Sequence, residues 1–134
     1  GTTAQAAATP GLIKSNEAAG VTVTMNYLNP SQNIPKGELA FQVKLDTHSI
    51  DLDQFKLEQI SFLQDEKGRE YPAKSWQPSQ GSEGHHVSGI LTFSNLDSEG
   101  KEVVTPDAAR MKIVVKGLAG VEERLFEWKN VSSK

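Results

Sequence analysis

Three histidines and the acidic residues near them are the side chains of this sequence best suited to a specific chemistry. Two histidines are adjacent in GSEGHHVSGILTF (residues 81–93), and the third lies among aspartates in LDTHSIDLD (residues 45–53). Imidazole together with carboxylate oxygens suits Zn(II) or Cu(II). Only neutral imidazole binds these metals, so affinity would fall below about pH 6. The candidate metal ligands are His48, His86, His85, Asp46 and Asp51.

These residues must be brought together by two strands. Residues 39–46 and 85–93 alternate apolar and polar side chains, which is typical of a strand with one buried face. In an immunoglobulin-type order they are antiparallel neighbours, so the end of the first lies beside the start of the second. Parity then points His48 and His86 outward, whereas His85 shares the inward face of Val87.

A second interpretation of the same corner needs no metal. Polar corners collect His, Asp and Ser because these residues accept turn conformations and hydrogen-bond the backbone. Asp46 or Asp51 would then orient His48 or cap a turn, and the corner would be structural or pH-sensing. The sequence has no HExxH or HxH spacing that would favour the metal.

The same period-2 alternation recurs along the chain and predicts the fold class. About seven short strands separated by turn residues favour an all-β, immunoglobulin-like two-sheet sandwich of antiparallel strands. We expect a bulge near Gln59 in the third strand, an edge position for the fourth because of Pro72, and a buried Trp128. The expected strands span residues 21–28, 39–46, 55–64, 69–76, 85–93, 110–116 and 121–131.

Length and composition limit the classes of protein to which this chain can belong. A chain of 134 residues fits one domain, and a net charge of −3 without a basic cluster argues against a nucleic-acid partner. No apolar run approaches the ~20 residues that span a bilayer. Residues 1–19 begin with the small, uncharged GTTAQAAATPG and are predicted to be a flexible linker before a domain at residues 20–131.

The sequence carries no recognisable catalytic constellation. It has no cysteine and no G-x-S-x-G elbow, and its paired acids fit a solvated face better than a cleft. P-loop and dinucleotide fingerprints are also absent. We therefore expect a protein that is not an enzyme and has no cofactor other than the alternative Zn or Cu.

Trp76 is the aromatic residue most open to two interpretations. It lies in AKSWQPSQGSEG (residues 73–84), a polar segment, so its ring either tucks over the end of the sandwich or contacts a partner. The tucked position is the favoured one. If the ring is exposed, Trp76 is the expected partner-binding residue.

Three segments, LAFQVKLDTHSIDLD, LQDEKGREYPAKSW and GHHVSGILTF, resemble small exported bacterial immunoglobulin-like domains of largely uncharacterised function. The resemblance covers roughly residues 20–130 and implies a periplasmic, cell-surface or secreted location. It assigns no activity to particular residues. We therefore expect an extracytoplasmic binding or accessory domain whose partner is an unidentified protein or envelope component. Membrane contact is expected only through an anchor upstream of residue 1.

Overall fold

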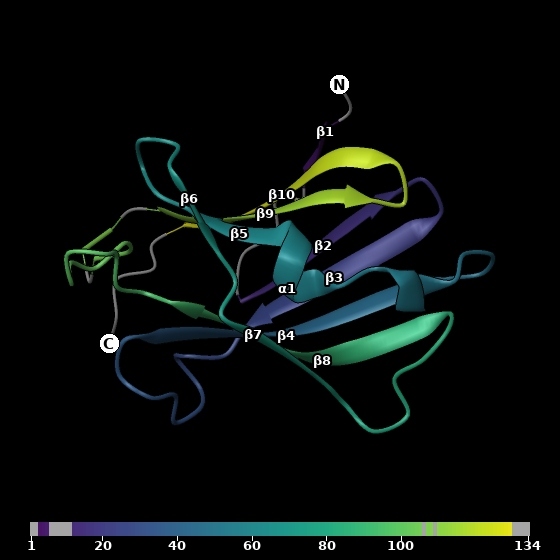
Figure 1. Cartoon of the computed structure of the whole chain (residues 1–134), viewed down its shortest axis with the longest axis horizontal. Coiled ribbons are helices and arrows are strands. Elements are labelled where there is room, and N and C mark those ends of the chain that lie inside the picture. The colour runs from purple at the N-terminus through teal and green to yellow at the C-terminus, as the bar shows by residue number, and fades with distance from the viewer. Residues whose placement is uncertain (1–2, 6–11, 106, 109, 130–134) are drawn as a thin grey trace.

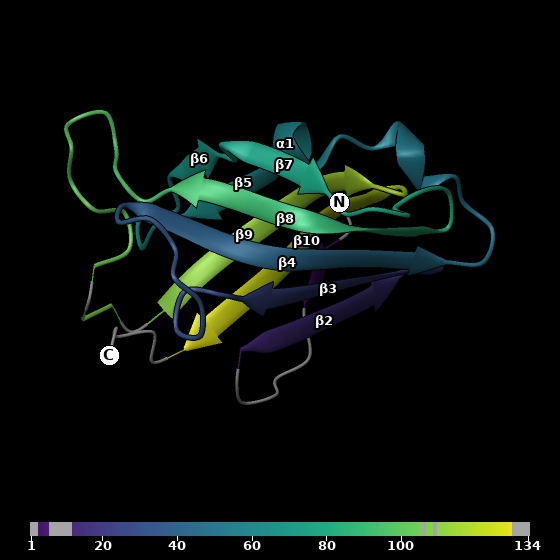
Figure 2. The same cartoon turned by 90° about the horizontal axis from the view of Figure 1, so that it is seen from below.

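The fold is an all-β sandwich of two sheets, as expected. A computed structural model describes residues 3–5, 12–105, 107–108 and 110–129 (Figure 1). One sheet has the strand order β1-β10-β9-β5-β6 and the other β2-β3-β4-β8-β7. Figure 2 looks onto the second sheet, with β9 and β10 crossing behind it. The strands are β1 (Thr3–Gln5), β2 (Ile13–Ala18), β3 (Val21–Tyr27), β4 (Glu38–Thr47), β5 (Ser61–Gln64), β6 (Glu70–Pro72), β7 (Ser75–Pro78), β8 (His86–Ser94), β9 (Arg110–Leu118) and β10 (Val121–Lys129).

The core lies between the sheets and is built by the alternation seen in the sequence. In β3 every second residue is buried, and the threonines and asparagine between are partly exposed. The aromatic centre of the core includes Phe41, Phe93 and Trp128, with ring centroids 5.1 Å apart for Phe41 and Trp128. The buried position predicted for Trp128 is confirmed, and its Nε1 donates a hydrogen bond to the carbonyl oxygen of Leu12.

The predicted pairing of the strands before and after the histidine corner is also confirmed. Strands β4 and β8 are antiparallel neighbours, with Glu38 opposite Ser94 and Asp46 opposite His86. The carboxyl end of β4 therefore lies beside the start of β8. This register decides which of the candidate ligands can meet.

The prediction of a linker over residues 1–19 is wrong for residues 3–5 and 13–18, which form strands. Strand β1 pairs in parallel with β10, with Ala4 opposite Arg124. Strand β2 pairs along its whole length with β3, from Ile13 opposite Asn26 to Ala18 opposite Val21. The inward side chains of β2 include Lys14 and Asn16, which are polar, so the strand has no apolar period to detect. Residues 1–2 and 6–11 of the predicted linker, and the predicted domain end at residue 131, lie outside the described residues.

The predicted third strand over residues 55–64 is wrong in its first half. A 3₁₀ turn, η1 (Leu52–Gln54), and a one-turn helix, α1 (Leu57–Ile60), precede the strand β5. The sequence shows a change of parity near Gln59, for which a bulge was expected. The chain absorbs that change by a helical turn, which buries Leu57 and packs Ile60 against the core.

The predicted fourth strand over residues 69–76 is divided between the two sheets. Strand β6 pairs with β5, and β7 pairs with β8 in the opposite sheet. Both are edge strands, which agrees with the presence of Pro72 and Pro78, since proline cannot donate to a ladder. This division, together with β1 and β2, raises the strand count from about seven to ten.

A buried arginine joins the first and last hairpins of the described chain. Arg124 on β10 is fully buried, and its guanidinium donates to the carbonyl oxygens of Ala18 at 2.9 Å and of Leu118 at 3.3 Å. It also donates to the carbonyl of Val21 and the side chain of Asn16. Burial lowers the pKa of Arg124 from its ordinary value. The N-terminal hairpin is thus fastened to the C-terminal strand by backbone carbonyls.

Candidate binding site

The two loop clusters that carry polar side chains lie at opposite ends of the sandwich (Figure 1). One is the histidine corner, where β4 ends and β8 begins. The other is formed by the β5–β6 turn and the segment between β8 and β9. None of the helices in the described ranges has the length and apolar character of a membrane span.

The histidine corner brings together two of the five predicted ligands. Nδ1 of His86 lies 2.8 Å from Oδ1 of Asp46 across the β4–β8 pair. The outward directions predicted for His86 and His48 agree with their exposed side chains. Within the described residues, no group of three or more His, Asp or Glu side chains is placed to hold a metal ion.

Asp51 and His85 take part in the local hydrogen bonds of the corner. The carboxylate of Asp51 accepts a hydrogen bond from the amide of Asp53 and so caps η1. The inward direction predicted for His85 is wrong, because His85 lies in the turn before β8 and is exposed. Its carbonyl accepts a hydrogen bond from the amide of Thr47. These bonds are the ones expected of a structural corner.

Trp76 takes the tucked position. It lies on the edge strand β7, is partly buried, and packs against the core cluster. The tip of its ring stands so near Gly89 that an added Cβ on the glycine would lie 2.8 Å from it. Strand β8 therefore needs glycine at this position to let β7 and its tryptophan approach.

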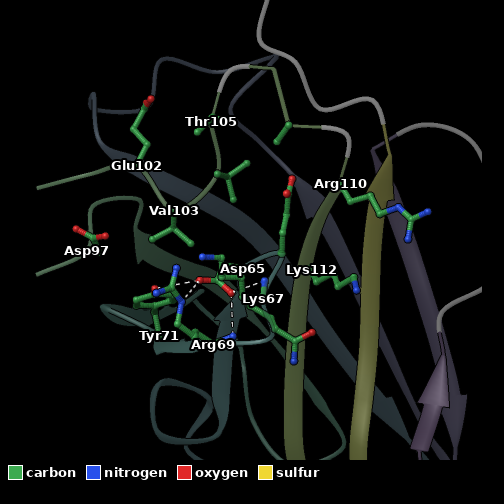
Figure 3. Close-up of a pocket in the computed structure, with 14 residues that line it drawn as sticks. Asp65, Lys67, Arg69, Tyr71, Asp97, Glu102, Val103, Thr105, Arg110 and Lys112 are labelled. Atoms are coloured by element: carbon green, nitrogen blue, oxygen red, sulfur yellow. Dashed lines mark hydrogen bonds and ion pairs between the residues drawn. The ribbon is translucent and has the colours of Figure 1, made fainter. Parts of the chain in front are cut away.

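A cavity of about 510 Å³ lies at the end of the sandwich opposite the histidines (Figure 3). This volume is in the range of small-molecule sites. Its walls are the β5–β6 turn, residues 97–105 and the first residues of β9. The lining includes the bases Lys67, Arg69, Arg110 and Lys112, the acids Asp65, Glu66, Asp97 and Glu102, and the less polar Tyr71, Val103, Val104 and Ala108.

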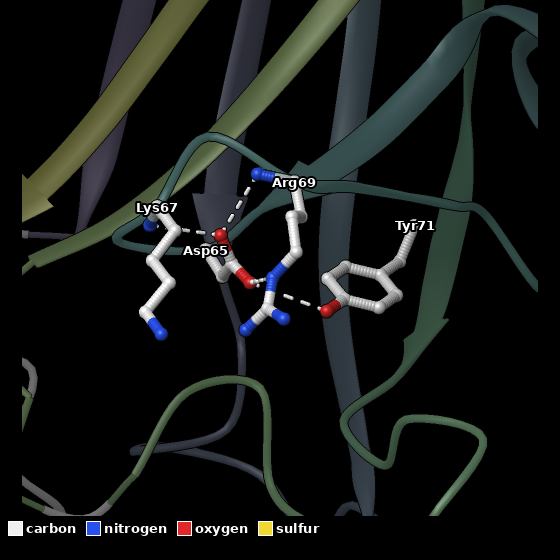
Figure 4. A network of polar contacts seen from close by, with 4 residues as sticks. All are labelled: Asp65, Lys67, Arg69 and Tyr71. Atoms are coloured by element: carbon white, nitrogen blue, oxygen red, sulfur yellow. Dashed lines mark hydrogen bonds and ion pairs between the residues drawn. The ribbon is translucent and has the colours of Figure 1, made fainter.

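Asp65 organises one side of this cavity (Figure 4). Its Oδ1 accepts hydrogen bonds from the amides of Lys67 at 2.9 Å and Arg69 at 2.8 Å. Its Oδ2 accepts from Nε of Arg69 at 2.7 Å and from the hydroxyl of Tyr71 at 3.2 Å. Four donors thus converge on one buried carboxylate, which leaves it little capacity for a ligand.

The protonation states follow from these bonds. Burial alone would raise the pKa of Asp65, but hydrogen bonds from Arg69, Lys67 and Tyr71 outweigh burial and hold the pKa below its ordinary 3.8. Burial, followed by the hydrogen bond to Asp65, raises the pKa of Tyr71. At neutral pH Asp65 is therefore ionised and Tyr71 is protonated. This pair does not supply a carboxylic acid able to donate a proton.

A second turn of the same design borders the cavity. Asp65-Glu66-Lys67-Gly68-Arg69 and Asp97-Ser98-Glu99-Gly100-Lys101 share the pattern D-x-x-G-[K/R]. Oδ1 of Asp97 accepts from the amides of Glu99 and Lys101, as Oδ1 of Asp65 does from the equivalent positions. These amide bonds are the main reason that the pKa of Asp97 is lowered.

Residues 65–68 connect the strands expected at residues 55–64 and 69–76, and the strand pattern alone gave no sign of a site there. The detectable signal was the repeated D-x-x-G-[K/R] pattern, in which the aspartate caps its own turn and glycine takes a positive φ. What the pattern could not give is that the β5–β6 turn and the turn between β8 and β9 border one cavity. No known protein family, curated protein or solved structure matches this chain.

Proposed function

We propose that this protein is a non-catalytic binding domain and that its ligand occupies the cavity at the Asp65 end. The observation that carries the proposal is the concave volume of about 510 Å³ lined by charged and apolar side chains. Such a combination is typical of a site that fixes the orientation of a small ligand. Asp65 is fully used in fixing the turn, which favours binding over acid–base catalysis.

The immunoglobulin-like assignment belongs to this proposal. Its support is the strand order, since β3-β4-β8-β7 faces β10-β9-β5-β6, as strands A-B-E-D face G-F-C in immunoglobulin domains. An extracytoplasmic location, with an envelope component as partner, fits the composition of residues 1–11 and the resemblance to exported domains. We propose that location on these grounds.

A screen of small fragments tests the binding proposal. The ¹⁵N-labelled protein is titrated with neutral, cationic and anionic fragments, and amide shifts are followed. We expect at least one fragment to move the resonances of cavity residues such as Tyr71 and Val103 and to leave those of the histidine corner unmoved. A screen in which no fragment of any charge perturbs the cavity would refute the proposal.

Zinc or copper binding at the histidine corner is the alternative function. The observation in its favour is the contact between Asp46 and Nδ1 of His86, because carboxylates commonly orient metal-binding imidazoles in this way. If the alternative is right, micromolar Zn(II) or Cu(II) raises the melting temperature, and the double variant His48→Ala, His86→Ala abolishes the rise. An unchanged melting temperature in the parent protein would exclude it.

A further inference from the structure

We infer that the cavity binds a small organic carboxylate that carries an apolar group, with the guanidinium of Arg69 as its anchor. The inference rests on the proposed binding function and names the class of ligand. It depends on three properties of the cavity: an oriented guanidinium, the balance of charge around it, and an apolar wall.

Arg69 is held in place by groups that leave its outer donors available. Nε bonds to Asp65 at 2.7 Å, and the amide of Arg69 bonds to the same carboxylate at 2.8 Å. Neither η nitrogen has a hydrogen-bond partner among the described residues. Figure 4 shows both η nitrogens projecting away from Asp65. The Arg69 side chain is 65% exposed, so these outer donors face solvent at the cavity wall. Two parallel N–H donors on a guanidinium oriented through Nε match the two oxygens of a carboxylate.

The charges around Arg69 favour a single negative charge on the ligand. Lys67 and Lys112 line the cavity without an ion pair in the described structure, so they add positive potential. Asp97 and Glu102 lie on the other side of the Asp65 cluster from Lys112 (Figure 3), and Asp97 interacts electrostatically with Arg69. The four bases and four acids of the lining balance in formal charge, so a second negative charge, as in phosphate, costs more desolvation without adding net attraction.

The apolar wall selects the rest of the ligand. Val103, Val104 and Tyr71 are partly exposed where they line the cavity, so a bound apolar group would remove their surface from water. Removal of this apolar surface from water favours binding. An aromatic or branched aliphatic carboxylate should therefore bind more tightly than acetate.

Benzoate is the probe, and three compounds separate the contributions. Acetate keeps the charge without the ring, benzamide keeps the ring without the charge, and inorganic phosphate adds charge. The ¹⁵N-labelled protein is titrated with each, following the side-chain Nε–H of Arg69 and the amides of Tyr71 and Val103. We expect benzoate to bind at least about tenfold more tightly than benzamide, because hydrogen bonds to a charged group are the stronger ones. Benzoate should also bind more tightly than acetate and phosphate, which lack the ring. N-acetylphenylalanine and its amide extend the test to the carboxylate of a peptide C-terminus.

Two variants and one matched control locate the anchor. Arg69→Ala should weaken benzoate binding about tenfold or more, and Arg69→Lys should recover only part of the loss, because lysine keeps the charge without the fork. Lys101→Ala is the control, since Lys101 occupies the position equivalent to Arg69 in the second turn and does not line the cavity. Thermal unfolding of each variant shows that the fold is retained.

The outcomes separate this inference from the function on which it rests. Equal binding of benzoate and benzamide, or unchanged benzoate binding by Arg69→Ala, would overturn the carboxylate inference and leave the binding function standing. The same holds if only neutral or cationic fragments reach the cavity. If no compound of any charge does so, the binding function itself fails.

Discussion

The two D-x-x-G-[K/R] turns differ in surroundings although their backbones are built alike. Both aspartates accept amide bonds from the second and fourth residues after them, and both turns have a glycine with positive φ. Asp65 is buried and also binds the side chains of Arg69 and Tyr71. Asp97 is only partly buried, and Lys101 at the end of its turn pairs with Glu99 instead. The first turn therefore orients side chains toward the cavity, and the second mainly closes a loop.

Replacing the aspartate of each turn by alanine should reveal the largest difference in stability between the two turns. We expect Asp65→Ala to lower the free energy of unfolding by roughly 2 kcal/mol, because four donors lose a buried acceptor. Asp97→Ala should lower it less, since water reaches the amides that it leaves. Urea unfolding of both variants measures the difference. Equal losses would mean that the side-chain bonds of Asp65 add nothing to those of the turn.

Replacing the glycines should affect both turns alike. Gly68 has φ +84 and Gly100 has φ +81, and an added Cβ would meet nothing within 4 Å at either position. Alanine at either position should therefore lower the free energy of unfolding by about 1 kcal/mol, because alanine adopts a left-handed backbone less readily than glycine. The same urea experiment checks this expectation. A much larger loss of unfolding free energy at Gly68 would show that the added methyl group also clashes with neighbouring side chains at the cavity.

Acid should weaken both turns in the same range of pH. The pKa of Asp65 and that of Asp97 are lowered in the folded protein, so each carboxylate stabilises the fold above its unfolded pKa. That stabilisation is lost as the pH falls below about 4 and passes through the folded pKa. The difference in unfolding free energy between the parent and Asp65→Asn should shrink over this range, and Asp97→Asn should behave likewise. A difference independent of pH between 6 and about 2 would contradict the assignment.

Removing the tyrosine hydroxyl should give the smallest effect. Tyr71→Phe deletes one of the four bonds to Asp65, so the pKa of that carboxyl should move up toward its ordinary value. Asp97, in the other turn, should titrate as before. Carboxyl carbon shifts followed through an acid titration measure both groups. An unchanged pKa of Asp65 would show that the hydrogen bond from Tyr71 does not stabilise the ionised carboxylate.

The sequence was informative where one face of a strand is apolar. Alternation located β3, β4, β8, β9 and β10, and the pairing of β4 with β8 followed from their order. Strand β2 escaped prediction because Lys14 and Asn16 occupy its inward positions. The division of residues 69–76 between the sheets depends on where the chain crosses the sandwich, which no local pattern encodes.

The candidate site was less accessible to prediction than the fold. The histidines attracted attention by their chemistry, and the expected strand order correctly brought the end of β4 beside the start of β8. Asp46, which was expected to orient His48, contacts His86 instead. The cavity instead depends on two turns that are 32 positions apart by their first residues, Asp65 and Asp97, and on the valines that follow the second. Tertiary structure alone places these residues around one volume.

The buried guanidinium of Arg124 has a consequence for the order in which the chain is completed. Its acceptors at Asn16, Ala18 and Val21 precede it by more than 100 residues. During synthesis the N-terminal hairpin emerges first, yet its partner on β10 leaves the ribosome only near the end. The β2–β3 hairpin can pair locally once it has emerged. Its contacts with Arg124 span most of the chain, so we expect docking of the two hairpins to be a closing step of folding.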